Sequence, residues 1–115
     1  MSTLTIWHNP RCSKSREALK LLEESGQAFE VVKYLDENPS KEDLEALLKK
    51  MSLRPREIMR TKEAIYKELD LKNEEDDAKL IEAMVANPKL IERPIIIKED
   101  SAIIARPPSL TTEFI

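Results

Sequence analysis

Residues 4–26 read LTIWHNPRCSKSREALKLLEESG, and this stretch decides the expected fold. LTIW (4–7) has the β-prone composition of a short strand, and Pro10 favours a loop directly after it. From Ser13 onward apolar residues recur at helical spacing, and Gly26 stands where a helix commonly ends in a left-handed residue. This order places Cys12, the only cysteine of the chain, in a loop between a strand and a helix.

The pattern continues with a second strand, FEVVKYL (29–35), so the first part of the chain is a βαβ unit with parallel strands and a right-handed crossover. PIIIKEDSAIIAR (94–106) contains two β-branched runs around a polar tetrapeptide, which is typical of a hairpin. Helical spacing between these regions predicts helices over 41–50 with Ser40 as cap, over 54–71, and from Asp76 or Asp77 to Ala86, where Asn87-Pro88 ends the helix. A short closing helix is expected from Ser109.

These elements predict an α/β fold, a small mixed sheet flanked by helices. A helical insertion over about 40–87 separates the βαβ half from the C-terminal hairpin. A chain of 115 residues is long enough to bury its own core, so we expect one domain over 1–115. Ligands in such folds favour the loop after the carboxyl end of a strand, which is where Cys12 lies.

The composition excludes several classes of protein. A single cysteine forms no internal disulfide, and the N-terminus has no basic segment followed by an apolar run, so we expect a reduced protein of the cytoplasm. No stretch approaches the run of about 20 apolar residues that a membrane helix needs. The net charge of −3 and five aromatic residues argue against a nucleic-acid surface.

Positive charge is nevertheless concentrated around the thiol. Residues 1–16 carry +3, from Arg11, Lys14 and Arg16, so the rest of the chain carries −6. These cations, the start of a helix and a protonated His8 would all favour the thiolate of Cys12. Other interpretations remain: a lone cysteine is often a buried small hydrophobe, His8 can simply bond a loop carbonyl, and the cations can be solvated helix residues. A metal site is not expected, because Cys12 and His8 have no second cysteine or histidine to complete it.

Three of the seven prolines follow arginine, at Arg54-Pro55, Arg93-Pro94 and Arg106-Pro107. The residue before proline is held extended, which fixes the direction of its side chain. Arg93 and Arg106 bracket the expected hairpin, so both can project at the same end of the sheet and bind a tetrahedral oxyanion through bidentate hydrogen bonds. The alternative is that these are solvated arginines beside turn prolines.

HNPRCSKSR after the first strand, NPKLIERPIII and the later ARPP together resemble the glutaredoxin-coupled arsenate reductase (ArsC) family over nearly the whole chain. The resemblance implies a thioredoxin-like fold, with Cys12 as the nucleophile and His8 favouring its thiolate. It also implies oxyanion binding by Arg60, Arg93 and Arg106, with Ser15 a further substrate-binding candidate, and a cis-proline at Pro94. Arg60 is carried over from the resemblance alone, since REIMRTKE reads as a charged helix.

The resemblance further implies arsenate, or a similar oxyanion, as substrate, with no bound cofactor. Because the chain has no second thiol, glutathione as co-substrate and glutaredoxin as partner would supply the other sulfurs. We expect a monomer. Two alternatives share the fold and the cysteine: an Spx-like regulator that binds RNA polymerase, and a monothiol glutaredoxin-like protein that acts on glutathione mixed disulfides. Ser15 stands where Spx-like regulators typically have a second cysteine, which argues against an internal thiol switch.

Overall fold

A computed structural model describes residues 4–99 and 101–115 of the chain. The chain divides into two compact units: one contains both ends, up to Glu37 and from Arg93 onward, and the other is Asn38–Glu92. The second unit contains the whole helical insertion expected over about 40–87 and extends beyond it. That residues 1–115 form one domain stays a prediction.

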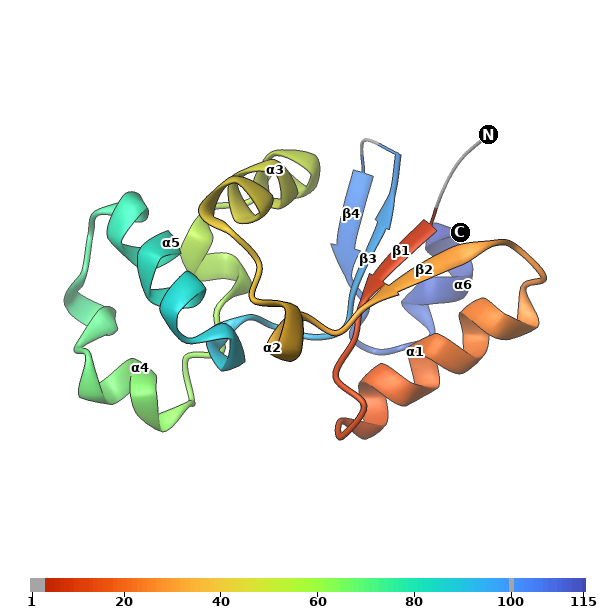
Figure 1. Cartoon of the computed structure of the whole chain (residues 1–115), viewed down its shortest axis with the longest axis horizontal. Helices are drawn as coiled ribbons and strands as arrows, with labels where there is room; N and C mark the ends of the chain where they lie inside the picture. Colours follow the sequence, from red (N-terminus) through yellow and green to blue (C-terminus); the bar gives the residue numbers. More distant parts are fainter. Residues whose placement is uncertain (1–3, 100) are drawn as a thin grey trace. The chain divides into compact units, whose positions relative to one another are not determined.

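The first unit is built on a four-stranded mixed sheet (Figure 1). Its strands lie in the order β2-β1-β3-β4, with β1 parallel to β2 and the other two pairs antiparallel. The strands are β1 (Leu4–Trp7), β2 (Phe29–Val32), β3 (Ile95–Lys98) and β4 (Ser101–Ile104). Both the parallel βαβ unit and the C-terminal hairpin are therefore confirmed. The β3–β4 connection passes through Asp100, which lies outside the described residues.

Helix α1 (Ser13–Glu24) packs against this sheet through its apolar face, as the periodicity predicts. Ala18 and Leu22 of the helix are fully buried together with Leu4, Ile6 and Ile96 of the strands. Gly26 follows the helix with φ 74°, the left-handed conformation that glycine adopts without steric cost. Helix α6 (Leu110–Phe114), the predicted closing helix, lies beside α1 (Figure 1). Its partly buried Phe114 packs against the same core.

The second strand ends earlier than predicted. It was expected over 29–35, but β2 stops at Val32 and the chain turns into the short helix α2 (Tyr34–Glu37). The carboxylate of Glu37 accepts a hydrogen bond from the backbone N–H of Lys33 at 2.7 Å, which stabilises the start of this turn. The fully buried ring of Tyr34 stacks on Trp7, with 6.2 Å between ring centroids. The turn thus places the aromatic side chain of Tyr34 in the core.

In the second unit, two helices follow the sequence pattern closely. Helix α3 (Lys41–Met51) begins at Ser40, whose side chain accepts from the backbone N–H of Asp43 while the Asp43 carboxylate accepts from the N–H of Ser40. Helix α5 (Asp77–Ala86) has Asp76 as its N-cap, bonded to the N–H of Ala78 at 2.9 Å. Each helix starts where the sequence supplies a side chain that accepts from a free backbone N–H.

The prediction of a continuous helix over 54–71 is wrong. The segment contains two short helices, η1 (Pro55–Ile58) and α4 (Ala64–Glu68), and a third, η2 (Leu71–Asn73), follows them. Further along the chain, η3 (Pro88–Leu90) is followed by the extended residue Ile91. Between the helices, Arg60 donates its backbone N–H to the carbonyl of Leu90 at 2.7 Å, and Glu92 donates to the carbonyl of Ile58 at 2.8 Å. These long-range bonds replace the hydrogen bonds of a continuous helix, which no local pattern reveals.

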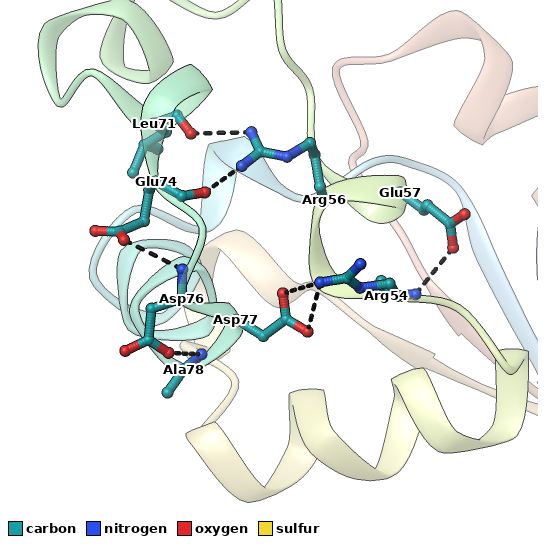
Figure 2. Close-up of polar contacts among 8 residues, drawn as sticks. All are labelled: Arg54, Arg56, Glu57, Leu71, Glu74, Asp76, Asp77 and Ala78. Carbon is teal, nitrogen blue, oxygen red and sulfur yellow. Dashed lines mark hydrogen bonds and ion pairs between the residues drawn. The ribbon is translucent and has the colours of Figure 1, made fainter.

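Side chains hold the irregular parts of the second unit in place (Figure 2). The half-buried guanidinium of Arg56 donates to the backbone carbonyls of Leu71 and Glu74 and to the hydroxyl of Tyr66. Arg54 pairs with the carboxylate of Asp77 at 3.1 Å on the surface. Arg56 therefore adds a second donor to the carbonyl of Leu71, which also accepts from the backbone N–H of Glu74, and supplies a donor to the carbonyl of Glu74.

Candidate functional site

Cys12 lies in the loop between β1 and α1, directly before the first residue of the helix. Its backbone N–H donates to the carbonyl of Asn9 at 3.0 Å, and the Asn9 side chain accepts from the N–H of Arg11 at 3.0 Å. The side chain and the main chain of Asn9 thus fold the loop back on itself. Cys12 is 9% exposed, so the sulfur lies at the edge of the core but remains reachable.

The surroundings of Cys12 favour its thiolate. Burial alone raises the pKa of the thiol, but the backbone N–H groups of Ser15 and Lys14 and the guanidinium of Arg93 lower it further than burial raises it. The pKa of Cys12 therefore lies below its ordinary value of 9.0. The helix start acts as expected, but the side chains of Arg11 in the loop and Arg16 in helix α1 are not among the groups that lower this pKa.

Arg93 and Arg106, which bracket the hairpin, both approach the sulfur. Nη2 of Arg106 lies 3.9 Å from Sγ of Cys12, and its Nε donates to the backbone carbonyl of Arg93 at 2.8 Å. Nε of Arg93 is buried and has no hydrogen-bond partner among the described residues. The peptide bonds Arg93-Pro94 and Arg106-Pro107 are both cis; the resemblance implies this isomer for Pro94. The sulfur thus faces two guanidinium groups, and the buried Nε of Arg93 has no bonded acceptor among the described residues.

The hydrogen-bond partner of the His8 side chain is Ser15; among the described residues, no hydrogen bond joins His8 to the sulfur of Cys12. Its Nδ1 lies 2.6 Å from Oγ of Ser15, and this hydroxyl also accepts from the backbone N–H of Asn9 at 3.0 Å. Burial, followed by the charges of Lys33 and Arg16, lowers the pKa of His8 below 6.5. At pH 7 the neutral form of the imidazole therefore predominates, and its bonded neighbour is Ser15, whose backbone N–H lowers the pKa of Cys12. A role of His8 in favouring the thiolate stays a prediction.

Arg60 belongs to the second unit, and its guanidinium is held there by two carboxylates. Nη1 donates to Glu63 at 2.6 Å, and Nε lies 3.6 Å from Glu92. These bonds explain its half-buried position without a ligand. A role of Arg60 in oxyanion binding stays a prediction.

Sequence reasoning missed which cation lowers the pKa of Cys12. Arg93 is far from Cys12 along the chain, and only the proline after it marked its side-chain direction. The effect of Lys33 on the pKa of His8 was also not predicted, because Lys33 lies in a segment whose composition is typical of a strand. Among the described residues, no group of three potential ligands is placed to hold a metal ion. None of the helices in residues 4–99 and 101–115 is long and apolar enough to cross a bilayer.

A sequence profile described as the ArsC family matches residues 7–114. The chain belongs to the ArsC family. It is 48% identical over 109 residues to a protein of Neisseria meningitidis named arsenate reductase, an alignment that covers 93% of each chain. It is also 49% identical to the Escherichia coli protein YfgD, whose name states no function, over 96% of this chain and 94% of the relative.

The fold agrees with solved structures of this ArsC group. A structure titled arsenate reductase from Vibrio cholerae is 46% identical, covers 98% of both chains and superposes with a TM-score of 0.94. The four-stranded mixed sheet flanked by helices, with its helical insertion, is thus the thioredoxin-like fold that the sequence predicts.

Proposed function

We propose that this protein reduces arsenate to arsenite, with Cys12 as the nucleophile. The observation that carries the proposal is a thiol with a lowered pKa beside two guanidinium groups, Arg93 and Arg106. A thiolate and an oxyanion repel one another, and cations between them offset that repulsion. Relatives named arsenate reductase, at 48% and 46% identity, support arsenate as the oxyanion.

In the first step, the sulfur of Cys12 attacks arsenic and one arsenate oxygen leaves as water after protonation. We assign the guanidinium groups of Arg93 and Arg106 to the other oxygens, which they bind while the charge redistributes; the lack of a partner for Nε of Arg93 supports this assignment. We assign Ser15 and His8 the task of holding the loop in the shape that keeps the N–H of Ser15 near the sulfur. Arg60 is proposed as a third oxyanion ligand, on the resemblance.

The adduct needs two electrons, and the chain has no second cysteine to supply them. We propose that one thiol of glutathione and one of glutaredoxin provide them and become a mixed disulfide. Hydrolysis of the remaining bond between Cys12 and arsenic(III) releases arsenite and restores the Cys12 thiol. The net reaction converts arsenate and two thiols into arsenite, one disulfide and one water. A single thiol that must stay reduced fits the cytoplasm, and we propose that the protein acts there as a monomer.

The test is arsenate-dependent oxidation of NADPH, coupled through glutathione reductase, glutathione and glutaredoxin. We expect turnover by the wild type and none above background by Cys12→Ser, which removes the nucleophile and keeps the shape. Equal rates for both proteins would reject the proposal.

Two further outcomes would point to the alternative functions. Turnover of a glutathione mixed disulfide without arsenate would favour the monothiol glutaredoxin-like activity. Capture of RNA polymerase, together with no arsenate turnover, would favour an Spx-like regulator.

A further inference from the structure

A cavity lies beside the cysteine loop, within the first unit. It has a volume of about 220 Å³, and its walls come from two segments, residues 8–11 and residues 33–36. The first segment leads directly into Cys12, and the second is the turn at which β2 ends early. The lining residues are His8, Asn9, Pro10, Arg11, Lys33, Leu35 and Asp36.

Charged side chains in this cavity lack partners from the protein. Arg11, Lys33 and Asp36 are exposed, and none of the three side chains forms an ion pair or hydrogen bond within the described part of the chain. Lys33 is close enough to His8 to lower the pKa of the imidazole, so its charge reaches into the cavity. With His8 neutral, the cavity presents two positive charges and one negative charge.

The cavity is distinct from the oxyanion site, because neither Arg93 nor Arg106 lines it. The loop of Asn9, Pro10 and Arg11 forms part of its wall, and the same loop holds Cys12 through the Asn9 carbonyl. A ligand seated here would therefore lie beside the loop that carries the nucleophile, without displacing an anion from the two arginines.

We propose that this cavity binds the small thiol co-substrate, a peptide that carries two carboxylates and one ammonium group. Arg11 and Lys33 pair with the carboxylates, and Asp36 pairs with the ammonium group. Glutathione has this pattern of charges at neutral pH. The side chain of Leu35 supplies an apolar contact. The inference rests on the proposed function, since it names where the co-substrate of that reaction binds.

Binding is tested with S-methylglutathione, whose thiol is blocked, so that no turnover is needed. Calorimetry gives the dissociation constant, and amide chemical shifts in NMR spectra give the location. We expect shifts at Asn9, Arg11 and Lys33, a dissociation constant about threefold higher for Arg11→Gln and for Lys33→Gln, and about tenfold higher for the double variant. The matched control Lys20→Gln removes one exposed cation from α1 of the same unit and should bind as tightly as the wild type.

The outcomes separate this inference from the proposed function. Shifts that map outside the cavity, affinity that Arg11→Gln and Lys33→Gln do not change, or no binding at millimolar concentration would overturn the cavity assignment, even if arsenate is reduced. If the wild type shows no arsenate turnover but S-methylglutathione binding weakens in Arg11→Gln and Lys33→Gln as expected, the cavity assignment stands and arsenate reduction is rejected. In an active protein, the variants should raise KM for glutathione and leave KM for arsenate unchanged.

Discussion

In the second unit the arginine side chains bond to acceptors of the protein itself, whereas the two arginines near Cys12 contact no carboxylate among the described residues. Arg54 pairs with Asp77, and Arg56 donates to the backbone carbonyls of Leu71 and Glu74 (Figure 2). Arg56 also donates to the hydroxyl of Tyr66. Arg60 is held by Glu63 and Glu92.

The same guanidinium group therefore serves two purposes. Where its donors are bonded within the protein, it stabilises loops, and in Arg54 and Arg60 a carboxylate also neutralises its charge. Where it faces a sulfur and keeps a free donor, as Arg93 does, its charge remains available to the thiolate and to an incoming anion. Substitutions in the first group should alter stability, and those in the second should alter chemistry.

The largest effect on chemistry is expected for Arg93→Gln. Removing this cation should raise the pKa of Cys12 toward its ordinary value, because the remaining burial favours the neutral thiol. Arsenate reduction should slow on the order of 100-fold, as when a charge-stabilising donor is lost. The pH dependence of alkylation by iodoacetamide reports the pKa. In Arg54→Gln, which makes the same change of charge in the second unit, the pKa of Cys12 should match that of the wild type. An equal shift of this pKa in both variants would refute the distinction between the two groups of arginines.

Arg56→Ala should reverse the pattern, with a loss of stability and little change in thiol chemistry. The substitution removes the Arg56 donor from the carbonyl of Glu74 and one of the two donors from the carbonyl of Leu71, at a cost of about 2 kcal/mol in the free energy of unfolding. Urea denaturation measures this cost. The control is Arg54→Ala: its side chain is 75% exposed, so its ion pair should contribute less than about 1 kcal/mol. A greater loss for Arg54→Ala would contradict the assignment.

The smallest effect is expected for His8→Gln, which should change only how stability depends on pH. The pKa of His8 is lower in the folded protein than the ordinary value of 6.5, so the unfolded chain takes up a proton first as the pH falls. This contribution to stability is complete above pH 6.5 and declines as the pH falls toward the folded-state pKa.

Urea midpoints measured between neutral pH and about pH 5 should therefore fall less steeply for His8→Gln than for the wild type. Titration of Cys12 is common to both proteins and cancels in the difference. Identical slopes would show that the imidazole is not buried as described.

Much of the fold could be predicted because its signals are local. The strand 4–7, the helix from Ser13 with its glycine stop, and the hairpin at 94–106 each depend on spacing within a few residues. The caps Ser40 and Asp76 bond to N–H groups two or three residues further on, which a sequence pattern records directly. The position of Cys12 at a helix start was predictable for the same reason.

The sequence by itself determined the order of the elements and the place of a single thiol where backbone N–H groups converge. Tertiary structure alone decided that Arg93, and not the cations next to Cys12, lowers the pKa of the thiol, and that His8 is neutral. It also decided the early end of β2 and the breaks between residues 54 and 71. The physical reason is that these features depend on burial and on bonds between residues far apart in the chain, such as Arg60 to Leu90, which compete with local preferences and replace them.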